Sequence, residues 1–169
     1  MGECYFTTAQ FARRDRTYRK HCGPTAVTNL VCTLKPALAA EPASVFDDVA
    51  RIGRRLGVYW NLGVTKRIGG TNDVFAGHYL RRVLDHFAIP ATVRAGGPAT
   101  AARLRAALAK GAIVYLEMHL HPKYHNHHLL VYGCDWQGFR AADGWQRQPV
   151  YLTERDLRCC LFFSVAAEK

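Results

Sequence analysis

The spacing of apolar residues changes once along the chain, near residue 111. Before that point apolar residues recur every three or four positions, which is the period of an amphipathic helix. This spacing predicts helices over residues 24–34, 42–56, 72–87 and 98–109. Beyond it apolar and polar residues alternate, so we expect strands over residues 112–120, 129–134, 139–142, 150–152 and 161–166.

The segments between these elements predict shorter structures. We interpret residues 1–21 as an entry strand and a loop, residues 57–72 as a glycine-rich loop, and residues 91–94 as a short strand. Because the helical segments come first and the strands follow, the order favours an α+β fold with an antiparallel sheet. The length of 169 residues fits a single domain that spans residues 1–169.

Composition and charge narrow the class of protein. Apolar residues make up 49% of the chain and charged residues 21%, which excludes a disordered protein. No apolar run is long enough to cross a bilayer, and residues 1–20 hold no secretory signal, so we expect a cytoplasmic protein with no membrane partner. The net charge of +10 comes mostly from arginines spread along the chain. That distribution predicts a solvated basic surface, which favours an acidic partner over nucleic acid.

Cys22 is the candidate nucleophile among six cysteines that show no Cys-x-x-Cys spacing. Without that spacing or a secretory signal, we expect reduced thiols rather than a disulfide framework. Cys22 lies at the mouth of the first predicted helix, where the helix dipole and free N–H groups favour a thiolate and an oxyanion. Gly23 leaves space for a substrate backbone to approach. The alternative is that Cys22 is a small buried apolar residue.

The histidine-rich stretch supplies the candidate base, since five of the eight histidines lie between residues 119 and 128. Strand alternation places His127 and His128 on opposite faces, so only one of them can readily face Cys22. Asp143 lies sixteen residues after His127, past the return strand of a hairpin, and can orient the imidazole. Alternatively, Asp143 belongs to an ordinary Asp-Gly turn.

Four segments resemble the papain-like cysteine peptidases, in the same order along the chain: residues 22–26, 110–114, 127–133 and 143–144. The chain looks closest to the bacterial branch related to bacteriocin-processing, double-glycine leader peptidases. In this family the catalytic His heads an apolar strand that ends in Gly six residues later, a spacing that His127 keeps with Gly133. The resemblance implies a papain-like fold, a Cys22–His127–Asp143 triad and a peptide or protein substrate.

One position departs from the family pattern. Such peptidases usually carry a Gln a few residues before the Cys, often six, whose amide helps to form the oxyanion hole. Residue 16 is Arg in this chain. The resemblance therefore points to Gln10, twelve residues before Cys22, as the candidate oxyanion donor.

Together these residues predict a thiol-dependent hydrolase of peptide or isopeptide bonds that needs no cofactor. An acyltransferase or transpeptidase with the same triad is one alternative, and a non-catalytic peptide-binding domain is another. A different interpretation gives the histidine-rich stretch to a metal ion. It would use the pairs His119/His121 and His125/His127, completed by Glu117 or Cys134. The competing interpretation is an exposed histidine-rich loop at the rim of the cleft.

Overall fold

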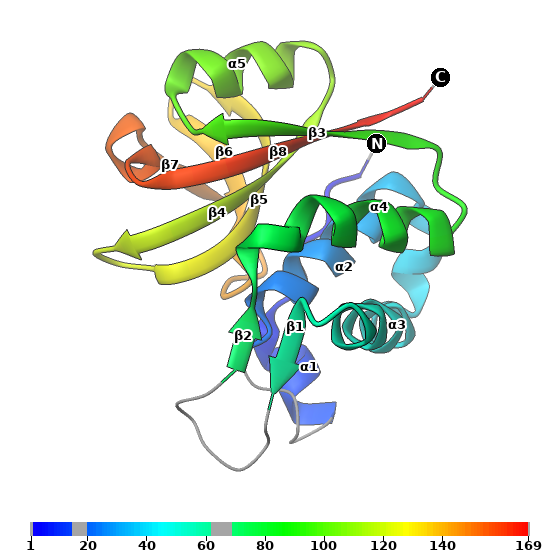
Figure 1. Ribbon diagram of the computed structural model, residues 1–169. Helices are drawn as coiled ribbons and strands as arrows, with labels where there is room; N and C mark the ends of the chain where they lie inside the picture. The colour runs from blue at the N-terminus through cyan, green and yellow to red at the C-terminus, as the bar shows by residue number, and fades with distance from the viewer. Residues whose placement is uncertain (1, 15–19, 62–68, 169) are drawn as a thin grey trace.

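The computed structural model describes residues 2–14, 20–61 and 69–168 (Figure 1). The helices are α1 (Thr8–Arg14), α2 (Cys22–Leu34), α3 (Pro42–Arg55), α4 (Ala76–His86) and α5 (Ala101–Ala109), with 3₁₀ turns η1 (Pro36–Ala40), η2 (Asp73–Phe75) and η3 (Glu154–Leu157). Helices α2 to α5 confirm the helical periodicity. The Asn72 side chain caps η2 by accepting from the Val74 N–H, and a capping box at Thr153 begins η3.

Six strands form one antiparallel sheet in the order β3-β8-β4-β5-β6-β7. Their bounds are β3 (Ala91–Pro98), β4 (Ile113–His121), β5 (His125–Asp135), β6 (Gly138–Ala142), β7 (Val150–Leu152) and β8 (Cys160–Ala167). Every pairing in this sheet is antiparallel. The fold is therefore α+β, with most helices N-terminal and an antiparallel sheet C-terminal, as the order of the periodicities predicts.

The sheet is covered on both faces (Figure 1). Side chains of β4 alternate between the two: Ile113 and Tyr115 pack with α2, α3 and α4, whereas Val114 and Leu116 pack with α5. The same alternation in β5 places Leu130 against the helical layer. Helix α2 thereby lies directly on β5, which brings the two segments with candidate chemistry together.

Two predicted loops contain regular structure instead. Residues 8–14 form α1, where the sequence suggested only an entry strand and a loop. Within the predicted glycine-rich loop, β1 (Tyr59–Asn61) and β2 (Gly69–Thr71) pair as a hairpin that packs against α2 and α3. Residues 62–68 of that loop lie outside the described residues. Three-residue strands are too short to show the alternation on which strand prediction depends.

Strand β3 is longer than predicted. The prediction ended at residue 94 because Ala95-Gly96-Gly97-Pro98 has the composition of a turn. Its partner β8 provides the ladder that the segment lacks by itself, with a bulge between Ala95 and Gly97. A Cβ at Gly96 would lie 2.1 Å from the Phe162 ring, so the glycine makes room for that ring. Among the described residues, no helix is both long and apolar enough to cross a membrane.

Candidate functional site

A cavity of about 660 Å³ lies where the start of α2 meets the start of β5. Cys22, His127 and His128 all line it, together with Asp73 from η2 and Trp145 from the turn after β6. The helix mouth and the histidine strand are far apart in the sequence. The antiparallel sheet and the α2–β5 contact bring them to one pocket, as the proposed pairing of thiol and imidazole requires.

Cys22 is the first residue of α2, as predicted, and its side chain is half-buried. The preceding residue, His21, does not cap the helix, because its Nε2 donates to the Thr8 carbonyl at 2.9 Å. Burial raises the pKa of the Cys22 thiol, and hydrogen bonds from the backbone N–H groups of His128 and Gly23 offset part of that rise. The expected stabilisation of a thiolate at the helix mouth is thus outweighed by burial, and the resting thiol is neutral.

His127 is 4% exposed and is held by the segment that follows β6. Its Nε2 donates to the Asp143 carbonyl at 2.6 Å, and its ring packs on Trp145 with the centroids 4.7 Å apart. Since a carbonyl oxygen only accepts, Nε2 carries the proton and Nδ1 is the free basic nitrogen of the neutral ring. Burial lowers the pKa of His127, and the Asp143 carbonyl and carboxylate charge offset part of the shift. The imidazole is therefore neutral at pH 7 and able to accept a proton.

Asp143 reaches His127, but through its main chain rather than through its carboxylate. The carboxylate Oδ1 accepts from the N–H groups of Trp145 at 2.8 Å and Gln146 at 3.0 Å. Both interpretations of this residue thus describe part of what it does: the side chain builds the Asp-Gly turn, and the turn aims the carbonyl at the imidazole. Its Oδ2 is buried and has no hydrogen-bond partner among the described residues.

Gln10 lies in α1, and it is not among the described residues that line the cavity. Its Oε1 accepts from the Thr7 N–H at 2.7 Å, so the side chain caps its own helix. Thr8, two residues earlier, does reach the site, since it lines the cavity and its N–H donates to the Gly144 carbonyl at 2.7 Å. Arg16, the position where the family usually has its Gln, lies outside the described residues.

His128 also lines the cavity, on the face of β5 that meets α2. Its Nδ1 lies 2.9 Å from the Tyr115 hydroxyl and its Nε2 lies 3.3 Å from Asp73 Oδ1. Burial lowers the pKa of His128 to about 3, with the charges of His127 and His119 adding to the shift. Both nitrogens are engaged and the ring resists protonation, so His127 is the better base. Sequence reasoning missed Asp73, because a helix-cap position gives no sign that the fold brings it to β5.

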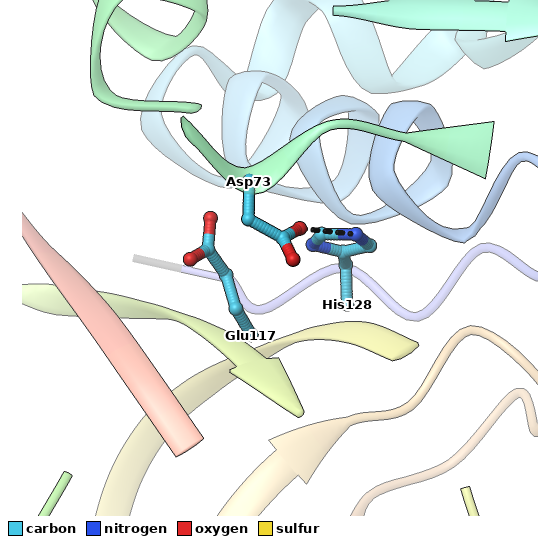
Figure 2. Close-up of side chains that lie close together, drawn as sticks. All are labelled: Asp73, Glu117 and His128. Atoms are coloured by element: carbon cyan, nitrogen blue, oxygen red, sulfur yellow. Dashed lines mark ion pairs between the residues drawn. The ribbon is translucent and has the colours of Figure 1, made fainter. Parts of the chain in front are cut away.

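Among the described residues, the histidine pairs proposed for a metal do not form a group with metal-ligand spacing. His121 is engaged by Asp156, whose Oδ1 lies 3.1 Å from Nε2, and by the backbone N–H groups of Lys123 and Tyr124 at Nδ1. His125 is exposed at the start of β5. Instead, single side-chain atoms of Asp73, Glu117 and His128 lie within 4.8 Å of one another (Figure 2). Burial raises the pKa of Glu117 to about 8, and the charge of Asp73 adds to the rise.

All six cysteines are free in the structure. A scan of the chain against protein-family models gives no match, and a search of curated proteins gives none either. The function is therefore inferred from the geometry of this cavity and from the chemistry of its side chains.

Proposed function

We propose that the protein is a papain-like cysteine peptidase, a hydrolase of peptide or isopeptide bonds with Cys22 as nucleophile and His127 as base. The observation that carries the proposal is the shared cavity. A thiol at the start of α2 and a buried, neutral imidazole on β5 line the same pocket. The packing of α2 on β5 is also the arrangement expected if the fold is papain-like.

The proposed reaction starts from a neutral thiol and a neutral imidazole. His127 Nδ1 takes the proton as the Cys22 sulfur attacks the carbonyl carbon of the substrate. Backbone N–H groups at the start of α2 stabilise the oxyanion, because Gln10, the side-chain donor that the resemblance implies, caps α1 and does not line the cavity. The imidazolium then protonates the leaving amine, and water hydrolyses the thioester. Transfer of the acyl group to an amine instead of water would make the protein an acyltransferase with the same residues.

Labelling by a thiol-directed acyl probe tests the assignment of the nucleophile. We expect wild-type protein to be labelled at Cys22 and Cys22→Ala to lose the labelling. Cys134→Ala serves as the matched control, because Cys134 is an exposed thiol that does not line the cavity, so this variant should keep the labelling. Labelling that persists in Cys22→Ala and maps to another cysteine would refute the proposal.

The role of Asp143 gives a second prediction, because the carbonyl and not the carboxylate holds His127. Asn at this position keeps an oxygen for the Trp145 and Gln146 N–H groups, so the turn and the carbonyl stay in place. We expect Asp143→Asn to lower kcat/KM by less than about tenfold, against the roughly 10⁴-fold loss known when a carboxylate orients the base directly. Steady-state kinetics on a peptide substrate would distinguish the two roles.

The pH profile of the same variant separates positioning from a merely structural effect. Only neutral His127 acts as a base, so the acid limb of kcat/KM lies below the ordinary histidine pKa of 6.5. Removing the Asp143 charge removes an interaction that raises the pKa of His127, and the limb should move to still lower pH. A limb that stays in place would show that the carboxylate does not act on His127.

A further inference from the structure

Three polar side chains lie close together (Figure 2). Asp73 and His128 line the cavity, whereas Glu117 does not. Glu117 comes from β4 and His128 from β5, and the two are direct partners in the antiparallel register. Opposed residues share a face of the sheet, so both side chains project toward the helical layer. Asp73, at the start of η2, closes the group from the other side.

The carboxyl group of Glu117 has no partner for one of its oxygens. Glu117 is 1% exposed, and its Oε1 has no hydrogen-bond partner among the described residues. Burying a polar atom without a partner is destabilising, and more so if the atom is charged. Asp73 Oδ1 is likewise buried without a hydrogen bond, although His128 Nε2 lies 3.3 Å away. One ligand atom of Glu117 lies within 4.8 Å of one of Asp73. A shared proton or a cation between two carboxyl groups this close relieves the repulsion of their charges.

We propose that Asp73, Glu117 and His128 bind one divalent transition-metal ion. Two carboxylates and an imidazole form a mixed oxygen and nitrogen set, which suits Zn²⁺ or Mn²⁺ and is poorly matched to Mg²⁺. Neighbouring ligand atoms that each lie about 2.1 Å from one ion are about 3.0–3.4 Å apart. The observed limit of 4.8 Å exceeds that spacing, so each side chain would move by about 1 Å to complete the site.

The surroundings of His128 fit this role. A metal-bound imidazole normally donates its second N–H to an acceptor that fixes the ring, and the Tyr115 hydroxyl lies 2.9 Å from Nδ1. Nε2 is the nitrogen that faces Asp73, and the ion would replace the hydrogen bond that the ring also makes to the Thr71 backbone. His119 is the candidate fourth ligand, because its Nδ1 lies 3.5 Å from Asp73 Oδ2 and its Nε2 is buried without a partner among the described residues.

The bound ion would join the β2–η2 segment to the central strands of the sheet. Asp73 is the only contribution of that segment to the described cluster, whereas Glu117 and His128 belong to β4 and β5. Metal binding therefore has a readout that does not depend on the proposed peptidase activity. It should raise the thermal stability of the whole protein by mass action, and it should do so equally in Cys22→Ala.

The test is a titration of the metal-stripped, reduced protein with Mn²⁺. Mn²⁺ is chosen because it prefers oxygen and nitrogen ligands to thiolates. Electron paramagnetic resonance measures the concentration of free Mn²⁺ at each step. We expect one ion per chain and a higher Tm. Glu117→Gln keeps the shape of the side chain and removes its charge. Removing a residue that only supports a metal ligand costs about 10–100-fold in affinity. Because Glu117 would be a ligand itself, this variant should lose more than about 100-fold in Mn²⁺ affinity, and Mn²⁺ should not change its Tm. Asp73→Asn, at a half-buried position, should lose affinity in the same way.

His125→Ala is the matched control, because His125 is an exposed member of the same histidine-rich stretch outside the cluster. It should bind Mn²⁺ as the wild type does. A parallel Zn²⁺ titration in the Cys22→Ala background should rank the variants by affinity in the same order as Mn²⁺ does. Mg²⁺ should not raise the Tm of the protein. The proposal is overturned if wild-type protein binds no stoichiometric ion. It is also overturned if Glu117→Gln binds as well as wild type, or if His125→Ala alone removes binding.

Discussion

His127→Ala is expected to lower kcat/KM of the proposed peptidase by about 10²–10⁴-fold, the usual contribution of a positioned acid–base group. The size of the loss follows from the neutral resting state. Because burial raises the pKa of Cys22, little thiolate exists at pH 7 unless a base removes the proton during attack. His127 lines the cavity, and its Nδ1 remains available for this role, since Nε2 is committed to the Asp143 carbonyl.

The neighbouring histidine should not replace it. His128 is fixed between Tyr115 and Asp73, and burial lowers its pKa to about 3. A group with so low a pKa is a weak base, so the residual rate of His127→Ala should come from binding and oxyanion stabilisation alone. Added imidazole is expected to restore part of the rate, because the variant leaves a space under Trp145 that the free base can enter.

The matched control is His78→Ala, at an exposed position on α4 that does not line the cavity. This variant should keep the wild-type kcat/KM and Tm. If His127→Ala retains most of the activity while His128 variants lose it, the base would be His128, with Asp73 as its acidic partner. If neither histidine affects the rate of probe labelling, the cavity does not perform thiol chemistry.

The strongly periodic segments were predictable because each carries its own pattern. Helix α3 repeats Val45, Val49 and Ile52 on one side, and β4 is a short, mostly apolar run that alternates only after Leu116, so the local pattern is enough to identify both. The β1–β2 hairpin has no such pattern. Its three-residue strands exist because they pack on α2 and α3, and long-range packing of this kind is not visible in the local sequence.

The candidate site divides in the same way. Cys22 and His127 could be named from the sequence because one precedes a helical pattern and the other heads an apolar strand. The sequence could not show that Asp143 acts through its carbonyl, since that depends on how the turn after β6 folds back. Nor could it show the contact between Asp73 and the pair Glu117 and His128, which requires the η2 segment to lie over the sheet.

The structure gives a different reason for the glycine at position 23 from the one that the sequence suggests. The sequence suggested that this glycine lets a substrate backbone approach the sulfur, but the space above it is filled by Thr71 of β2. A Cβ at residue 23 would lie 2.2 Å from Thr71 Oγ1 and 2.8 Å from Thr71 Cβ. Thr71 is β-branched and stiff at χ1, so it cannot rotate away without moving the strand.

Gly23→Ala is therefore expected to destabilise the protein by about 1–3 kcal/mol, the usual cost of overpacking. At this chain length that corresponds to a decrease in Tm of about 2–12 °C, which calorimetry can measure. The clash should also push β2 away from the start of α2, where Gly70 and Thr71 line the cavity next to Cys22. Activity should consequently fall further than the loss of folded protein alone explains.

A double-mutant cycle identifies the clash as the cause. Thr71→Gly removes all three atoms that the new Cβ would meet, so Gly23→Ala in that background should cost much less than in the wild type. The coupling between the two positions should reach about 0.5–3 kcal/mol, as for residues in direct contact. Gly2→Ala is the control for a glycine with open space around it and should leave Tm unchanged. If Gly23→Ala costs the same in both backgrounds, Thr71 is not the residue that requires glycine at position 23, and contact of β2 with the helix mouth does not shape the cavity.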